Sequence, residues 1–387
     1  MPMFDFDKVW DRRDDPGDIK YSPVEGVEDA VPLWVADMDF KAPAEVTEAL
    51  VKASERGIFG YTATDEEYDN LVVAWQEKRH GWAVNPEHIL KTPGVVFAIS
   101  AAIRAFTSEG DSVLVCQPVY PPFTGITLAN SRRLVVSELV ADENGVYSVD
   151  LEDFERKIAD NDVKLFIFCS PHNPVGRVWT WKELSAISRI CLEHNVIIVS
   201  DEIHSDFIYP GNEHIPMATI SEEVADICVT CTAPSKTFNL AGLQISNIIV
   251  ENDDLRNKMK MSLGQTGYGC LNTLSIAAAR AAYKYGDKWL DALIAYLDEN
   301  KAMTESFFAM TDKIVLTPAE GTYLLWLDCR NFGISDKSLE ELFLREAGVR
   351  LQGGAEFGAG GSGFMRMNIA CPSSVLRRAL TRINKIL

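Results

Sequence analysis

Residues 226–243 read DICVTCTAPSKTFNLAGL, and the rest of the fold can be worked out from this stretch. Its first part, Asp226–Cys231, is rich in apolar residues and is predicted to be a buried strand, with Lys236 shortly after it. Strands that are hydrophobic throughout are buried on both faces, so they indicate a mostly parallel sheet covered by helices on each side. Four other segments have the same character: Ser112–Cys116, Leu165–Cys169, Val196–Ser200 and Ile245–Val250.

Candidate helices lie between these strands. They are Val95–Phe106 and Trp181–His194, and the second carries apolar residues at helical spacing after the turn-rich stretch Pro171–Gly176. We therefore expect residues 50–285 to form one large, doubly wound α/β domain with a mostly parallel sheet.

The pattern changes after Gly286. A long helix with apolar residues at helical spacing is predicted to link two lobes, and the elements beyond it are short. We expect segments 1–49 and 286–387 to form a smaller α+β domain, with a loop at a cleft over Gly353–Gly363. Its predicted strands and helices are Thr322–Leu327, Ser338–Ala347, Val349–Gln352, Phe364–Ile369 and Ser374–Ile386.

Composition and charge argue against several classes of protein. The 387 residues include 56 acidic and 37 basic ones, and the net charge of -19 would repel nucleic acid and anionic membranes. No apolar run approaches the ~20 residues that span a bilayer, and the N-terminus does not resemble a secretion signal. The eight cysteines are scattered among apolar neighbours, which favours free thiols in the cytoplasm. The single C-x-x-C pair, Cys228 and Cys231, is not expected to bind a metal.

Four residues follow predicted strands and carry chemically useful side chains: Tyr120, Asn173, Asp201 and Lys236. Each alone has an ordinary explanation, such as a surface lysine, an Asn-Pro turn or a helix-capping aspartate. In open α/β sheets, however, ligands bind at the carboxyl ends of strands. Their joint occurrence in this order therefore predicts one shared site.

These residue types match the requirements of pyridoxal 5'-phosphate (PLP). A lysine amine forms a Schiff base with PLP, an aspartate keeps the pyridine nitrogen protonated, and an aromatic side chain stacks on the ring. Gly94, Val95 and Val96 open a predicted helix, whose N–H groups and positive end suit a phosphate. A simple turn before a helix would have the same sequence pattern.

The sequence resembles the fold-type I PLP enzymes of the aspartate aminotransferase superfamily. Within it, the chain is similar to the cystathionine β-lyases (C–S lyases) of the MalY and PatB type. The resemblance runs from PLWVADMDF at Pro32–Phe40 and GYTA at Gly60–Ala63 to FMRMNIACP at Phe364–Pro372. Three further motifs are specific in combination: SPHNPVGRVW, SDEIHSDF and APSKTFNLAGL.

The resemblance implies roles around the cofactor ring. Lys236 would be the Schiff-base lysine and would move the proton at the substrate Cα. Asp201 would pair with the pyridine nitrogen, Asn173 would hydrogen-bond the phenolic oxygen, and Tyr120 would stack on the ring. The small-molecule substrate would be an amino acid.

The resemblance also implies roles for residues away from the ring. Ser235 and the amides of residues 94–96 would hold the phosphate. Tyr61 would reach the phosphate of the neighbouring subunit, so a homodimer with shared active sites would be the functional unit. Arg366 would bind the substrate α-carboxylate, because its planar fork suits two parallel hydrogen bonds. Trp34, with Tyr61 and Tyr120, would line the substrate side-chain pocket.

Three positions depart from the aminotransferase pattern. His204 stands where a tyrosine is usual and is expected to contact the cofactor, although local hydrogen bonds at a helix start could also account for it. Ala233 and Gln244 replace a serine and an arginine that usually bind the phosphate. Two phosphate ligands are therefore missing or replaced, while the DEIH sequence favours the lyase branch.

The predicted reaction is a PLP-dependent β-elimination. Cystathionine or another cysteine S-conjugate would give a thiol, pyruvate and ammonia. A class I/II aminotransferase is the alternative with the same residues, and a PLP-fold protein with a mainly regulatory binding role is a third. The sequence leaves open which conjugate is preferred.

Overall fold

The central feature of the computed structural model, which describes residues 4–387, is an eight-stranded sheet. Its strands lie in the order β2-β9-β8-β7-β6-β3-β4-β5. The pairs from β8 to β4 are parallel, whereas β9 and β5 run antiparallel to their neighbours. The strands are β2 (Ile89–Thr92), β3 (Ser112–Gln117), β4 (Arg133–Ala141), β5 (Tyr147–Val149), β6 (Val163–Cys169), β7 (Ile197–Asp201), β8 (Cys228–Thr232) and β9 (Ser246–Ile249).

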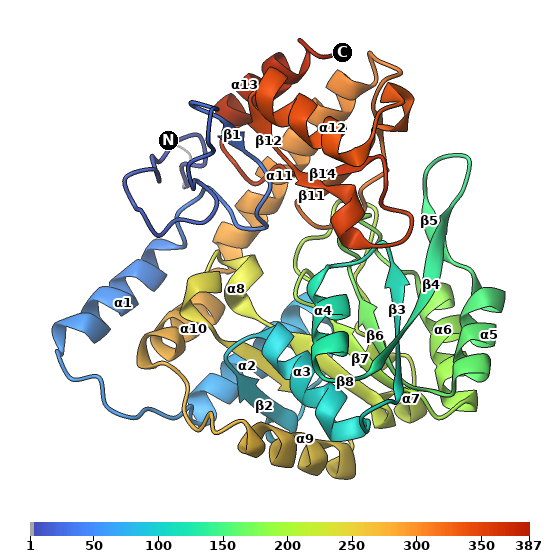
Figure 1. Ribbon diagram of the computed structural model, residues 1–387. Coiled ribbons are helices and arrows are strands. Elements are labelled where there is room, and N and C mark those ends of the chain that lie inside the picture. Colours follow the sequence, from blue (N-terminus) through green and yellow to red (C-terminus); the bar gives the residue numbers. More distant parts are fainter. Residues whose placement is uncertain (1–3) are drawn as a thin grey trace.

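Helices cover both faces of this sheet (Figure 1). Along β6, Leu165 and Ile167 pack in one hydrophobic cluster with α3, while Phe166 and Phe168 pack in the other. This alternation confirms the doubly wound, mostly parallel architecture expected from the hydrophobic runs. The helices before the long connecting helix are α1 (Ala44–Glu55), α2 (Glu66–His80), α3 (Val95–Phe106), α4 (Pro122–Ala129), α5 (Leu151–Asn161), α6 (Trp181–Glu193), α7 (Glu222–Asp226), α8 (Pro234–Thr237), α9 (Asp253–Gln265) and α10 (Thr273–Tyr285).

A second, smaller sheet follows the long helix α11 (Asp287–Phe308). Its four strands are all antiparallel to their neighbours, in the order β10-β11-β14-β13. The N-terminal strand β1 (Val31–Pro32) pairs in parallel with β12, so both ends of the chain lie in this upper part of the molecule (Figure 1). The remaining elements are β10 (Val315–Leu316), β11 (Leu324–Asp328), α12 (Asp336–Glu341), β12 (Val349–Arg350), β13 (Gln352–Gly353), β14 (Phe364–Asn368) and α13 (Ser373–Ile383).

Several predicted boundaries were wrong. The strand predicted from Asp226 begins at Cys228, because Asp226 is the last residue of the short helix α7. The helix predicted over Ser338–Ala347 is α12 followed by one π-helical turn, and Val349–Gln352 is divided between two strands of different sheets. The division into domains at residues 49/50 and 285/286 stays a prediction. No helix among residues 4–387 is long and apolar enough to cross a membrane.

Candidate active site

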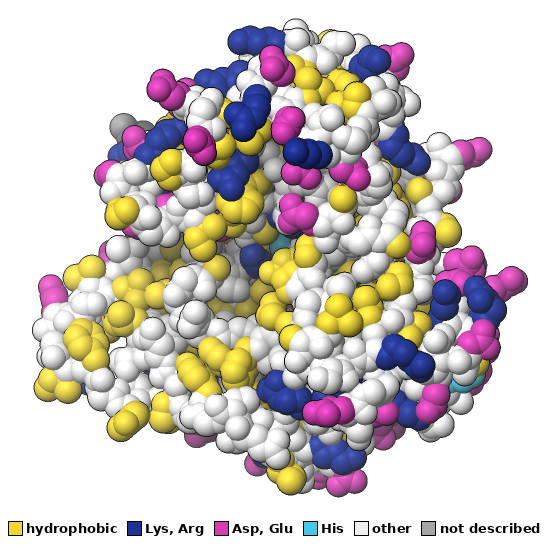
Figure 2. Space-filling view, viewed as in Figure 1, with side chains coloured by type: hydrophobic (Ala, Val, Ile, Leu, Met, Phe, Trp, Pro, Cys, Tyr) yellow, Lys and Arg dark blue, Asp and Glu magenta, His cyan; other side chains and the backbone are white. Residues whose placement is uncertain are grey.

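A cavity of about 560 Å³ opens at the carboxyl edge of the eight-stranded sheet. In the space-filling view it lies within the hollow between the upper and lower parts of the molecule (Figure 2). The lining residues come from β6, β7, α3, α8 and the loops beside them, and Ala36 comes from the N-terminal segment. They are Ala36, Pro93, Gly94, Val95, Val96, Phe97, Tyr120, Cys169, Asn173, Asp201, Ile203, His204, Ser235, Lys236, Ala241, Gln244, Ile245 and Tyr268.

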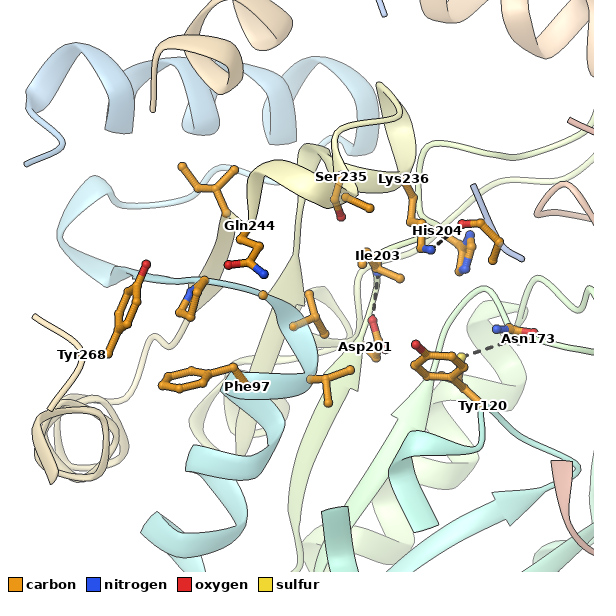
Figure 3. A pocket seen from close by; sticks show the side chains of 18 residues that line it. Phe97, Tyr120, Asn173, Asp201, Ile203, His204, Ser235, Lys236, Gln244 and Tyr268 are labelled. Carbon is orange, nitrogen blue, oxygen red and sulfur yellow. Dashed lines mark hydrogen bonds between the residues drawn. The ribbon is translucent and has the colours of Figure 1, made fainter. Parts of the chain in front are cut away.

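The four residues predicted from strand ends do meet in this cavity. Tyr120 follows β3, Asn173 follows β6, Asp201 ends β7, and Lys236 lies in α8 after β8. These four strands are neighbours in the sheet and parallel, so their carboxyl ends lie at one edge. Figure 3 shows Lys236, Asn173 and Tyr120 around one end of the cavity, with Asp201 nearer its middle.

Lys236 is held in an environment that disfavours its charge. Burial, followed by the nearby Arg366 guanidinium, lowers the pKa of Lys236 to about 8. Its amine donates a hydrogen bond of 2.5 Å to the backbone oxygen of Ala36. A lysine that loses its proton near neutral pH is suited to act as a nucleophile and a base.

Asp201 is buried at the end of β7. Burial raises its pKa to about 7, although a hydrogen bond from the Ile203 backbone N–H, 3.1 Å long, and the charge of Lys236 oppose the shift. A carboxylate in such a place is stabilised by a bound cation. A protonated ring nitrogen would meet that requirement.

His204 lines the same cavity beside Lys236 (Figure 3). Burial and the charges of Lys236 and Arg366 hold the pKa of His204 well below its usual value, so the imidazole is neutral. Its buried Nδ1 atom has no hydrogen-bond partner within residues 4–387. Local hydrogen bonds therefore do not account for this nitrogen, and a bound ligand is a fitting partner.

The opposite end of the cavity presents uncharged hydrogen-bond donors. Gly94 is the N-terminal cap of α3, and the first N–H groups of a helix have no partner inside it. Ser235 and Gln244 face the same space, with Phe97 and Tyr268 beyond them (Figure 3). This end is suited to an anionic group. The sequence had marked Gln244 only as a departure, and no local signal pointed to Phe97 or Tyr268.

Arg366 lies just behind the cavity wall on β14 and is 2% exposed. Its Nη1 donates to the side-chain oxygen of Asn173 at 3.1 Å, and its Nη2 donates to the backbone oxygen of Trp34 at 2.8 Å. The Nε atom is buried without a partner among the described residues. An arginine with an open donor is ready to accept a carboxylate.

Two other predicted residues lie outside the cavity lining. The Trp34 indole donates to the backbone oxygen of Lys20 at 3.0 Å and lies under the Arg350 guanidinium, so its backbone rather than its ring reaches Arg366. Tyr61 is 99% exposed and borders a separate surface hollow with Tyr268. Within one chain, the structure does not bring Tyr61 to the cavity.

All eight cysteines are free thiols, and only Cys270 is exposed. Burial raises the pKa of Cys228 and Cys231, which makes these thiols poor metal ligands. No cluster of His, Cys, Asp or Glu that could hold a metal ion occurs in residues 4–387.

Fold and site together define a class: a fold-type I PLP-dependent enzyme, with a mostly parallel sheet whose carboxyl edge carries a buried lysine and aspartate. More particularly, the chain belongs to the aminotransferase class I and II family, whose model matches residues 28–383. The resemblance inferred from the motifs is thereby confirmed.

The most similar relatives are described as lyases. The chain is 46% identical to cystathionine β-lyase PatB of Bacillus subtilis over 94% of both chains. It is 31% identical to protein MalY of Escherichia coli, over 98% of this chain and 97% of MalY. Among solved structures, cystalysin from Treponema denticola, which contains PLP, is 40% identical, with a TM-score of 0.95 over 99% of this chain and 98% of that chain. The PLP-bound C–S lyase from Staphylococcus hominis is 34% identical, with a TM-score of 0.91 over the same shares.

Proposed function

We propose that this protein is a PLP-dependent carbon–sulfur β-lyase that cleaves cystathionine or other cysteine S-conjugates to a thiol, pyruvate and ammonia. The observation that carries the proposal is the meeting of Lys236 and Asp201 in one buried cavity. Arg366, with its open donor, lies directly behind that cavity. The similarity to PatB and to the C–S lyases supports the choice of reaction.

The residues present fit PLP. The neutral donors around Gly94, Ser235 and Gln244 suit its phosphate, and the unpartnered Nδ1 of His204 suits a polar group of the ring. Asp201 suits the protonated ring nitrogen. PLP, when bound, withdraws the electrons left on the substrate Cα after a proton is removed.

Arg366 and Asn173 are proposed to orient the substrate. The hydrogen bond between them holds the guanidinium plane in place, and the free Nε can then bind the α-carboxylate together with a neighbouring N–H. Orientation at this point places the Cα hydrogen toward Lys236. Positioning of this kind lowers the barrier, because the reacting groups no longer have to find one another.

Lys236 is proposed to bind the cofactor covalently and to take the proton from Cα. Its lowered pKa leaves a large neutral fraction near pH 8, as a base requires. Asp201 is proposed to hold the proton at the pyridine nitrogen, since a positive partner offsets the burial of its carboxylate. Tyr120 lies beside Asp201 and is proposed to stack on the ring (Figure 3).

Tyr61 is proposed to act on the active site of a second copy in a homodimer, because it is fully exposed on its own chain. Exposed Ile58 and Phe59 precede it, and such a patch suits a subunit interface. We further propose that residues 50–285 form one domain, that segments 1–49 and 286–387 form the other, and that the free thiols reflect a cytoplasmic location.

The test separates a lyase from an aminotransferase. Purified protein loaded with PLP is given L-cystathionine, and pyruvate is measured with lactate dehydrogenase, with and without 2-oxoglutarate. A lyase forms pyruvate at the same rate in both. Product that appears only with 2-oxoglutarate would establish an aminotransferase instead, and absence of turnover with several cysteine S-conjugates would favour a regulatory role.

A further inference from the structure

The N-terminal segment 34–38 crosses the cavity wall with its backbone carbonyls engaged by side chains. All five carbonyl oxygens accept hydrogen bonds, which come from residues of both sheets and the loops beside them. In chain order the donors are Arg366, Asn368, Lys236 with Tyr323, Asn368 with Lys20, and Asn239 with Arg12.

Only the Ala36 carbonyl in this segment is bonded to the candidate catalytic lysine. Lys236 Nζ lies 2.5 Å from the Ala36 oxygen, and the hydroxyl of Tyr323 lies 3.0 Å from the same oxygen. A carbonyl oxygen has two lone pairs and can accept both hydrogen bonds. The two donors therefore share one acceptor at the wall of the cavity.

Tyr323 is a fully buried residue directly before β11. Its ring packs edge-on against Phe207 and against His204, with ring centroids 4.9 and 5.8 Å apart. Burial raises the pKa of Tyr323, so its hydroxyl stays protonated and remains a donor. The Ala36 oxygen is the one hydrogen-bond partner of this hydroxyl among the described residues.

We propose that Tyr323 is a positioning residue that keeps the Ala36 carbonyl hydrogen-bonded when Lys236 leaves it to bind the cofactor. The inference rests on the proposed covalent attachment of PLP to Lys236. In that step the amine condenses with the aldehyde of PLP, a carbon–nitrogen double bond forms, and one water leaves. The nitrogen then turns to the cofactor, and Tyr323 is the donor that remains on Ala36.

Removal of the hydroxyl acts on only one of the two states. While Lys236 is free, its amine still satisfies the Ala36 oxygen in Tyr323→Phe. Once Lys236 is attached to PLP, this buried oxygen has no donor, and an unsatisfied buried acceptor is costly. Tyr323→Phe therefore weakens attachment of the lysine without weakening non-covalent binding in the same cavity.

The experiment compares two ligands of the cofactor-free protein. PLP can condense with Lys236, whereas pyridoxamine 5'-phosphate has an amine in place of the aldehyde and cannot. Dissociation constants for both are measured by fluorescence titration for the wild type, Tyr323→Phe and Tyr209→Phe. Tyr209 is a matched control, because it is also buried but its hydroxyl has no partner among the described residues.

We expect Tyr323→Phe to raise the dissociation constant for PLP about 10-fold. Its constant for pyridoxamine 5'-phosphate stays within about twofold of wild type, and Tyr209→Phe changes neither constant. Equal weakening of both ligands, or no weakening of either, would overturn the proposal. If the wild type binds pyridoxamine 5'-phosphate but does not attach PLP, the proposed role of Lys236 fails as well.

A double-mutant cycle keeps the test sharp if Tyr323→Phe is poorly stable. In a Lys236→Ala background no covalent bond forms, so adding Tyr323→Phe is expected to leave PLP affinity within about twofold. A drop as large as that in the wild-type background would show a general structural effect and would contradict the positioning role.

Discussion

The guanidinium of Arg366 donates to the side-chain oxygen of Asn173 across 3.1 Å, and this bond joins the small sheet to the carboxyl edge of the large one. Because the oxygen of Asn173 is occupied by the arginine, its amide nitrogen is left to donate into the cavity. One asparagine thus connects the proposed carboxylate site with the proposed cofactor site.

Arg366→Lys is expected to lower kcat/KM about 10- to 100-fold, mainly through a higher KM. Lysine keeps the positive charge but cannot bond to Asn173, Trp34 and a carboxylate in one plane. Steady-state kinetics with L-cystathionine measure the effect, and Arg377→Lys on the exposed face of α13 is the control. A kcat/KM within twofold of wild type would remove Arg366 from the substrate site.

Arg366→Gln is expected to raise the pKa of Lys236 above about 8, because one of the two causes that lower it is the nearby guanidinium. Acetylation of Lys236 in the cofactor-free protein can be followed by mass spectrometry across pH. The midpoint should move to higher pH in Arg366→Gln and stay in place in Arg377→Gln. An unchanged midpoint in both would mean that Arg366 does not act on the lysine.

Asp201→Asn is expected to stabilise the cofactor-free protein while it weakens the bound state. The pKa of Asp201 is raised from 3.8 to about 7, so between these values the folded chain holds a proton that the unfolded chain releases. This contribution therefore lowers stability as pH rises through that window, and the loss is complete above about pH 7.

At pH 8 the melting temperature of cofactor-free Asp201→Asn should exceed that of wild type by at least about 2 °C. At pH 4 the difference should shrink, because the wild-type carboxyl is then protonated. Differential scanning calorimetry measures both, with exposed Asp160→Asn as the control. A lower melting temperature at pH 8 would mean that the carboxylate is stabilised without the cofactor.

Mixing Tyr61→Ala with Lys236→Ala is expected to restore activity. If Tyr61 completes the neighbouring site, each mixed dimer has one site in which both residues are native, so an equal mixture reaches about a quarter of wild-type activity. The two variants are denatured together, refolded and assayed for pyruvate. Failure to exceed the sum of the separate activities would contradict shared sites.

Local sequence was sufficient for the central strands and for the residues at their ends. The runs that became β3, β6 and β7 are hydrophobic on both faces, and this pattern arises from burial between two helical layers. The edge strands β4 and β5 were missed, because β4 alternates between buried and exposed residues and β5 is only three residues long. Tyr120, Asn173, Asp201 and Lys236 could be grouped, since parallel strands end at the same edge.

By itself, the sequence determined the fold class, the family and the set of residues at the strand ends, because these depend on periodicity and on short motifs. Only the tertiary structure decided which atoms meet. It brought Ala36 between Lys236 and Tyr323, left Nε of Arg366 open, and turned the ring of Trp34 away from the cavity. Such contacts join residues 200 or more positions apart, and their distances depend on how the two sheets pack together, which no local pattern encodes.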